Sequence, residues 1–277
     1  MIPVLLHLGP ITIYSYGLMM ALGFIAGDFL LTRECRRRGI SPDFANAIVV
    51  WGAIGGIAGS RLYDVFDNWP LYAANPWSII FSGAGFVWYG GFIGGLIAAA
   101  LVSRYYHVPI LRSFDMCAPA LILGQAFGRL GCLLSGDGDW GMPSTVPWAM
   151  AYPNAIVGWN ARTVLKLDSH GNLVSGFFPG VRVHPTPVYE AILYVAIFCM
   201  LWSMRKKAPE GRLLCLYLIL EGLARFMVEF LRVNPRVMFG LSEAQLISLP
   251  MIAIGLTAWY FTTARHPAVE APHALRA

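Results

Sequence analysis

Long apolar stretches alternate with short polar ones along this chain. Seven of the apolar stretches hold about 20 residues each, enough for a helix to cross the roughly 30 Å hydrocarbon core of a bilayer. They predict helices at residues 14–33, 44–64, 84–104, 115–134, 187–204, 213–232 and 245–264. A helix satisfies its own backbone hydrogen bonds, so it can cross lipid where an open sheet cannot. The pattern therefore predicts an all-α polytopic membrane protein with about seven transmembrane helices.

The polar stretches between the predicted helices differ in length. The longest, residues 135–186, is rich in Gly, Pro, Asp and Asn and predicts a small folded cap on the outer face. Residues 65–83 form a shorter outer loop whose aromatic residues are suited to the membrane interface. We expect residues 1–264 to form one transmembrane domain with the cap as an insertion, followed by a polar cytoplasmic tail at 265–277. The aromatic residues of the outer loop are Trp69, Tyr72 and Trp77.

Composition agrees with a membrane protein. Hydrophobic residues make up 57% of the chain and charged residues 13%, and the mean hydropathy is +0.60. An average soluble domain is about 25% charged. The net charge of +5 does not indicate a nucleic-acid partner, because the basic residues lie in short loops between the apolar stretches.

The basic residues instead predict the orientation in the membrane, since cytoplasmic loops carry an excess of Lys and Arg. Twelve of the 20 lie on one side if the N-terminus is outside, and five lie on the other. We therefore expect the N-terminus outside and the C-terminus in the cytoplasm. The twelve are Arg33, Arg36, Arg37, Arg38, Arg104, Arg112, Arg205, Lys206, Lys207, Arg212, Arg265 and Arg276.

The cysteines and the N-terminus give two further expectations. All five cysteines lie in or beside apolar stretches without metal-ligand spacing, so we expect neither a disulfide framework nor a metal site. The N-terminus lacks a basic region and an obvious cleavage site, so we expect no removable signal peptide.

Glycines are spaced four residues apart in the second and third predicted helices. Small residues at this spacing let helix backbones approach closely in a membrane, so we expect tight packing there. The overlapping pairs are Gly52/Gly56 and Gly55/Gly59, then Gly90/Gly94 and Gly91/Gly95.

Four ionisable residues lie in the sixth predicted helix, where each costs about 2.5–3.5 kcal/mol to insert. Glu221, Arg225, Glu229 and Arg232 have offsets of 0, 4, 8 and 11, which place them on one helical face. One interpretation is a self-neutralising ladder that only holds helices together. The other is the polar wall of an internal cavity.

Further polar groups belong to the outer ends of other predicted helices. Arg129 and Arg61 lie about one turn inside the outer boundary, and several arginines at one depth suit an anionic headgroup, because guanidinium groups bind phosphate oxygens in bidentate fashion. A transporter or channel could use similar residues. The remaining members of this group are Tyr14, Tyr16, His184, Tyr189 and Glu190.

Seven short motifs, in this order and spacing, resemble those of one family, the bacterial prolipoprotein diacylglyceryl transferases. Each motif alone is weak, but together they extend along almost the whole chain. They are Tyr16-Gly17-Leu18-Met19, Gly59-Ser60-Arg61, Gly90-Gly91-Phe92-Ile93-Gly94, Gly128-Arg129-Leu130-Gly131, His184-Pro185 with Tyr189-Glu190, Arg225 with Glu229, Phe230 and Arg232, and Gln245-Leu246-Ile247-Ser248.

The chain departs from the family pattern at its presumed site. Tyr89 stands where the family usually has His, and Cys132 stands where it has Asn. Asp137 aligns with a family Glu, and one extra residue follows before Trp140. Glu221 stands where the family has Tyr. The chain therefore resembles a divergent member of the family.

The resemblance implies an enzyme that transfers the diacylglyceryl group of phosphatidylglycerol to the lipobox cysteine of a preprolipoprotein, without a cofactor. On this reading Arg129 and Arg225 bind the phosphate and Glu229 orients Arg225. Tyr16 and Tyr89 contact the headgroup, and Tyr89 or a carboxylate helps remove the thiol proton. Further substrate-binding candidates are Arg61, Cys132, Asp137, Gly141, His184, Tyr189, Glu190, Glu221, Arg232 and Gln245.

Two other functions remain open at this point. A lipid-binding or accessory membrane protein could keep the scaffold without the activity, and the changes at Tyr89 and Cys132 favour that hypothesis. A transporter with a charged central site is the other, although transporters usually show two related halves with broken helices. The expected partners are phosphatidylglycerol, lipobox signal peptides and membrane lipids, and no nucleic acid.

Overall fold

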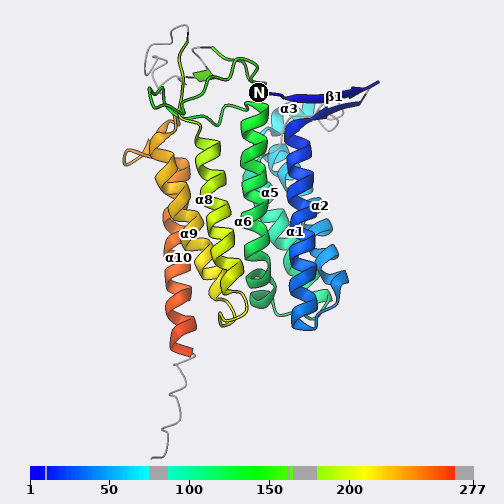
Figure 1. The fold of residues 1–277 in the computed structure, drawn as a ribbon. Coiled ribbons are helices and arrows are strands. Elements are labelled where there is room, and N and C mark those ends of the chain that lie inside the picture. The colour runs from blue at the N-terminus through cyan, green and yellow to red at the C-terminus, as the bar shows by residue number, and fades with distance from the viewer. Residues whose placement is uncertain (10, 75–86, 161–162, 165–179, 266–277) are drawn as a thin grey trace, which may run out of the picture. The chain divides into compact units, whose positions relative to one another are not determined.

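The structure is a computed structural model that describes residues 1–9, 11–74, 87–160, 163–164 and 180–265. A helix lies on each of the seven predicted stretches, which confirms a mostly helical protein (Figure 1). Boundaries differ from the predicted ones by a few residues. The helices are α1 (Ser15–Arg38), α2 (Pro42–Asp67), α5 (Trp88–Tyr105), α6 (Ile110–Ser135), α8 (Thr186–Met204), α9 (Arg212–Val228) and α10 (Glu243–Arg265).

Five helices in the described part of the chain are long and apolar enough to cross a membrane. They are α1, α2, α6, α8 and the Glu243–Thr262 part of α10. The protein is therefore a multi-pass membrane protein, as predicted. Seven crossings and the orientation of the two ends stay predictions.

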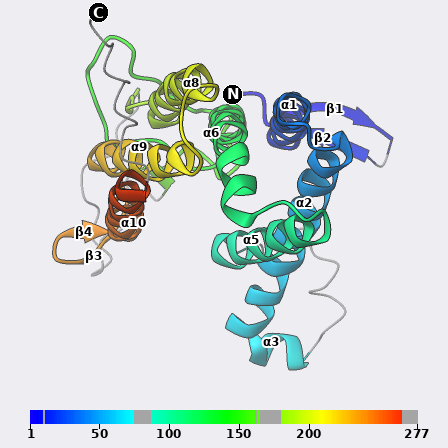
Figure 2. The same ribbon diagram turned by 90° about the horizontal axis from the view of Figure 1, so that it is seen from below.

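The chain divides into two compact units, one of Met1–Ala26 with Ala118–Ala277 and one of Gly27–Cys117. In the first unit, α9 packs between α8 and α10, as the view along the helices shows (Figure 2). Gly222 on α9 makes this possible, because a Cβ there would lie 2.9 Å from Ile252 on α10. Buried side chains between α6, α8 and α9 form the core of this unit, with Ala118, Tyr194, Leu201 and Leu213 among them.

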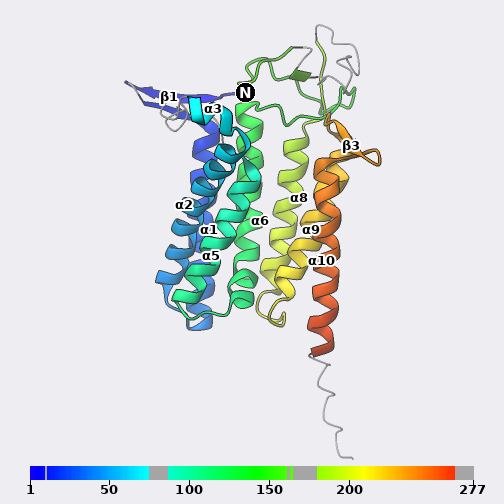
Figure 3. The ribbon, with the colours of Figure 1, turned by 180° about the vertical axis from the view of Figure 1, so that it is seen from behind.

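In the second unit, α2 and α5 lie side by side (Figure 3). Two of the predicted glycine pairs, Gly55/Gly59 and Gly90/Gly94, form the tightest part of their contact. A Cβ on Gly55 would meet the Gly94 carbonyl oxygen at 2.7 Å and the Ala98 side chain at 2.6 Å. Close packing through small residues is confirmed. A separate core at the other end of this unit includes Phe44, Ile48 and Val102.

Short elements that the hydrophobic pattern did not predict flank the helices. Strands β1 (Val4–Leu8) and β2 (Ile11–Tyr14) form an antiparallel hairpin, so Tyr14 belongs to a strand and α1 begins one residue later. Strands β3 (Arg236–Met238) and β4 (Leu241–Ser242) form a second hairpin before α10. Helix α3 (Trp69–Ala74) lies in the predicted loop 65–83, whose Trp77 is outside the described residues.

The described part of the cap contains isolated β-bridges. Val183 pairs with both Pro143 and Met150. Trp140, Tyr152 and Trp159 form an aromatic cluster with ring centroids 5.1–5.7 Å apart. The cap lies over the ends of α6 and α8, at the same end as the N-terminus (Figure 1). The polar tail predicted at 265–277 lies almost wholly outside the described residues.

Candidate active site

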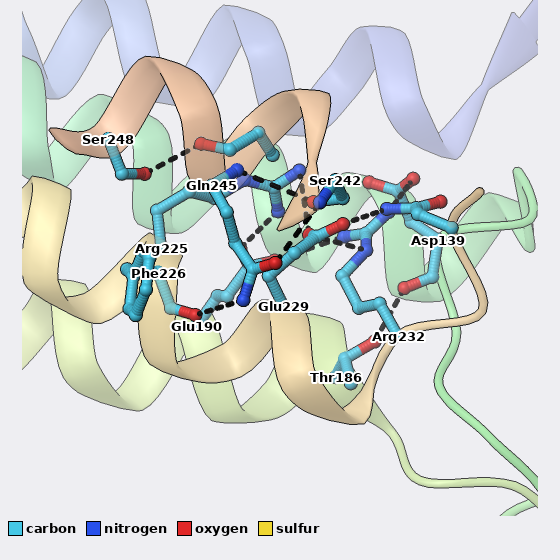
Figure 4. Close-up of polar contacts among 12 residues, drawn as sticks. Asp139, Thr186, Glu190, Arg225, Phe226, Glu229, Arg232, Ser242, Gln245 and Ser248 are labelled. Carbon is cyan, nitrogen blue, oxygen red and sulfur yellow. Dashed lines mark hydrogen bonds and ion pairs between the residues drawn. The ribbon is translucent and has the colours of Figure 1, made fainter. Parts of the chain in front are cut away.

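Glu190, near the start of α8, is the centre of a buried ion-pair network. Its side chain is fully buried, and its two oxygens contact three arginines. Oε1 lies 2.6 Å from Nη1 of Arg225, while Oε2 lies 3.0 Å from Nε of Arg129 and 3.5 Å from Nη1 of Arg232. Figure 4 shows how Glu190 and two of these arginines point toward one another from neighbouring elements. One carboxylate therefore fixes the positions of three guanidinium groups.

Glu229 supports two of the same arginines from the end of α9. The α-helix ends at Val228, earlier than predicted, and Glu229–Leu231 form a 3₁₀ turn. The charged residues still converge, because Oε2 of Glu229 lies 3.5 Å from Arg225 and 3.6 Å from Arg232. Its other oxygen accepts a hydrogen bond of 2.6 Å from the Asn234 amide.

Asp139 adds a third carboxylate from the cap. Its Oδ2 lies 2.5 Å from Nη1 of Arg129, and its Oδ1 accepts a hydrogen bond from Arg232. Its main-chain carbonyl accepts a 2.6 Å hydrogen bond from the Thr186 hydroxyl at the start of α8. Burial alone would raise the pKa of Asp139, but Arg232 and Arg129 hold that pKa well below its usual range. Asp139 is therefore ionised at neutral pH.

The three arginines differ in accessibility. The side chains of Arg129 and Arg225 are each 20% exposed, whereas that of Arg232 is 3% exposed. Ion pairs with described residues engage two of the three nitrogens of Arg129 and Arg225. A guanidinium group has five N–H donors. Arg129 and Arg225 can therefore receive an anion, while Arg232 holds Asp139, Glu190 and Glu229 together.

A second group of polar side chains lies at the end of α6. The sulfur of Cys132 and carboxylate oxygens of Asp137 and Asp139 lie within 4.8 Å of one another. Tyr16 packs here too, since a Cβ on Gly131 would lie 3.0 Å from its ring. A metal ion could use such a donor set, but both oxygens of Asp139 already contact guanidinium groups that balance its charge.

Gly141 ties the cap to the network through the backbone. Its N–H donates to the His184 carbonyl at 2.9 Å, and it forms a β-bridge with Arg232. A Cβ there would lie 2.6 Å from the Leu231 carbonyl oxygen, so only glycine fits. His184 lies just before the Pro185 N-cap of α8, and its Nδ1 is 3.1 Å from the Tyr189 hydroxyl.

Known proteins resemble this chain over nearly its full length. A sequence model of the family described as prolipoprotein diacylglyceryl transferase matches residues 3–261. The chain belongs to this family. Three relatives named phosphatidylglycerol–prolipoprotein diacylglyceryl transferase are similar to it. The Clostridium tetani protein is 35% identical over 92% of this chain and 95% of its own length. The Gloeobacter violaceus protein is 30% identical over 98% of this chain and 96% of its own length. The Nostoc sp. protein is 33% identical over 95% of this chain and 90% of its own length.

The resemblance to the diacylglyceryl transferases also assigns Gln245, Arg61 and Tyr89 to the site. Gln245 is buried at the start of α10, where its Oε1 accepts from the Ser242 N–H at 3.1 Å and from Arg236 at 2.8 Å. Arg61 and Tyr89 belong to the unit formed by Gly27–Cys117, where the Tyr89 ring packs 6.3 Å from that of Tyr63. Their roles in the reaction stay predictions.

Glu221 lies one turn before Arg225 on α9. It is buried, and its Oε2 has no hydrogen-bond partner among the described residues. Its neighbours include Tyr194 on α8. One turn before Glu221 on α9, the Tyr217 hydroxyl accepts a 3.2 Å hydrogen bond from the Gln125 amide on α6. A polar layer therefore continues from the arginines toward the middle of the helices.

Asp139 is the residue of the network that the sequence did not identify. The family motif aligned Asp137 with the transferase glutamate, yet Asp139 is the residue that contacts Arg129 and Arg232. The single extra residue before Trp140 was the available signal, because it shifts the register after Asp137 by one position.

Proposed function

We propose that this chain transfers the diacylglyceryl group of phosphatidylglycerol to the thiol of a lipobox cysteine in a preprolipoprotein, and releases glycerol 1-phosphate. Family membership and the names of the relatives support the reaction. The structural observation that carries the proposal is the arginine pair, Arg129 and Arg225. Both are partly exposed, and Glu190 holds both through ion pairs.

The arginine pair would bind the phosphate of the lipid. The lipobox sulfur attacks the carbon of the diacylglyceryl group that is bonded to the phosphate oxygen. That carbon–oxygen bond breaks, and negative charge builds on the phosphate of the departing glycerol 1-phosphate. Guanidinium groups stabilise such charge through short, directional hydrogen bonds. Because Glu190 and Glu229 fix the arginines before the lipid arrives, little reorganisation is needed when charge develops.

The charge balance of the network also fits an anionic substrate. Arg129, Arg225 and Arg232 offset Asp139, Glu190 and Glu229 within the described residues. A phosphodiester brings one further negative charge, which the partly exposed N–H groups of the arginine pair would receive. Tyr16, beside Gly131, would contact the headgroup. On the family resemblance alone, Tyr89 would also contact the headgroup and Arg61 would bind substrate.

The orientation of the chain completes the proposal. We infer seven transmembrane helices, with the N-terminus and cap outside and the loop at 205–212 in the cytoplasm of a bacterial inner membrane. The basic residues of the loops support this orientation. The lipobox peptide and the lipid headgroup would then meet at the outer surface, next to the cap.

Mass spectrometry of a lipobox peptide tests the function. Purified protein is incubated with the peptide in vesicles that contain phosphatidylglycerol, and one diacylglyceryl addition is expected. Vesicles of phosphatidylcholine alone and a peptide with Ser in place of Cys are the matched controls. Lipid binding without a mass shift would instead support the accessory protein.

A further inference from the structure

We propose that Asp137 accepts the proton of the lipobox thiol, while Asp139 positions the arginines. This inference rests on the proposed function and assigns a catalytic residue to it. The chain has two carboxylates at the motif position where the resemblance supplied one glutamate. The structure separates the two by what they contact.

Of these two carboxylates, only Asp139 forms ion pairs with the arginines among the described residues. Both of its oxygens contact guanidinium groups, from Arg129 and from Arg232. Asp137 forms no ion pair with the described residues, and one of its oxygens accepts the Asp139 backbone N–H at 3.2 Å. It is half-buried, so a substrate can reach it. Asp137 is therefore a carboxylate within the site that keeps free acceptor capacity.

The surroundings of Asp137 include a sulfur atom. The Cys132 thiol lies on the last turn of α6, next to the Asp137 carboxylate. The sulfur and the carboxylate oxygen lie within 4.8 Å. A carboxylate offers about four lone-pair directions, and the Asp139 N–H occupies one of those of Asp137. A second thiol, that of the substrate, fits the remaining capacity.

Electrostatics also favour Asp137 as the base. Burial raises the pKa of Asp137, and the neighbouring Asp139 carboxylate raises it further. A base works best when its pKa approaches the operating pH. Arg129 opposes this shift only weakly, since its charge is directed to Asp139 and Glu190. The titratable or charged groups that face Asp137 are Tyr16 on α1, Arg129 and Cys132 on α6, and Asp139 and Tyr152 in the cap.

The proton balance of the step is simple. The S–H bond of the lipobox cysteine breaks, and its proton moves to a carboxylate oxygen of Asp137. The sulfur electron pair forms the thioether bond to the glycerol carbon, and the carbon–oxygen bond electrons leave with the phosphate. Asp137 then gives the proton to the departing phosphate or to water, which restores the carboxylate.

A selenocysteine version of the lipobox peptide separates proton removal from every other role. A selenol is already ionised at neutral pH and needs no base. We expect Asp137→Asn to slow transfer to the cysteine peptide by about 10²–10⁴-fold, and to slow transfer to the selenocysteine peptide by less than about tenfold. Asp139→Asn is the matched comparison and should impair both peptides equally, because it disturbs the arginines. Asp43→Asn, at an exposed position in the first turn of α2, should change neither rate.

The pH dependence gives an independent readout. A thiol with pKa about 8.5 is about 3% ionised at pH 7 and half ionised at pH 8.5. The rate of Asp137→Asn with the cysteine peptide should therefore rise about 15-fold over that range, while wild type changes far less. Asp137→Glu should recover most of the activity and the wild-type profile.

Three results would overturn the assignment: full activity of Asp137→Asn, equal loss with both peptides, or a pH profile that matches wild type. A wild-type protein that modifies neither peptide would instead refute the proposed function. The two failures are therefore distinguishable. Thermal unfolding of each variant shows whether a lost activity reflects a lost fold.

Discussion

Replacement of Glu190 by Gln gives the most direct test of the ion-pair network. The amide keeps the shape of the side chain but removes the charge that faces Arg129, Arg225 and Arg232 at 2.6–3.5 Å. Three guanidinium groups would then face two carboxylates. Loss of one partner from a buried ion pair costs about 3–5 kcal/mol. Water screens part of this cost at two arginines that are each 20% exposed, so we expect a loss of about 3 kcal/mol.

Reversible unfolding in mixed micelles, followed by tryptophan fluorescence, measures this loss. Glu243→Gln is the matched control, because Glu243 is exposed in the first turn of α10 and its replacement should cost less than about 1 kcal/mol. We also expect the transfer rate of Glu190→Gln to fall about a hundredfold, since about 3 kcal/mol of lost positioning corresponds to roughly that factor. Equal stability of the two variants would refute the reasoning.

Added phosphatidylglycerol provides a second arm of the same experiment. The lipid phosphate supplies a negative charge that Glu190→Gln lacks. The lipid should therefore raise the unfolding midpoint of Glu190→Gln more than that of wild type. An equal rise in both proteins would mean that the phosphate does not lie against the arginines.

Four further predictions follow from other features. Arg225→Ala should abolish transfer in the peptide assay and Arg225→Lys should retain little, because a point charge lacks the planar fork of guanidinium; full activity of Arg225→Ala would disprove phosphate binding there. Tyr89→Phe should be impaired and Tyr89→His active, since both Tyr and His can hydrogen-bond a headgroup oxygen; an inactive Tyr89→His would count against that role. Gly55→Leu should destabilise the protein by about 1–3 kcal/mol through overpacking. Gly52→Leu should not, because a Cβ there would meet nothing within 4 Å. Equal unfolding midpoints of the two variants would contradict this. A cysteine at Lys206 should react with a membrane-impermeant reagent only after the membrane is opened, and labelling of intact cells would reverse the proposed orientation.

The helices were predictable because each has a simple physical cause. Apolar stretches of membrane-crossing length correspond to helices in the structure, and the glycine spacing in α2 and α5 corresponds to their contact. The hairpin of β1 and β2 was missed because its strands are as apolar as the helix that follows. Its signal was the Gly9-Pro10 pair between two short runs, since Gly and Pro mark turns.

The site was only partly predictable, because contacts between distant residues leave no periodic trace. Arg225, Glu229 and Arg232 were correctly placed together by their spacing on one helix. The substrate-binding role expected of Glu190 stays a prediction, but its full burial and its contacts with three arginines are encoded by no local pattern. The early end of α9 at Val228 also follows from the tertiary structure, in which the 3₁₀ turn places Glu229 and Arg232 beside Arg225.

The connection between Asp139 and Arg232 has a consequence for the synthesis of the protein. The two residues are 93 positions apart, and ribosomes add about 5–20 residues per second. Arg232 therefore emerges about 5–20 s after Asp139. Arg129 and Glu190 are therefore synthesised, and enter the bilayer, before α9 brings its charges to the network. A nascent chain that stops before α9 would carry an incomplete set of charges in lipid, which makes it a natural substrate for membrane quality control.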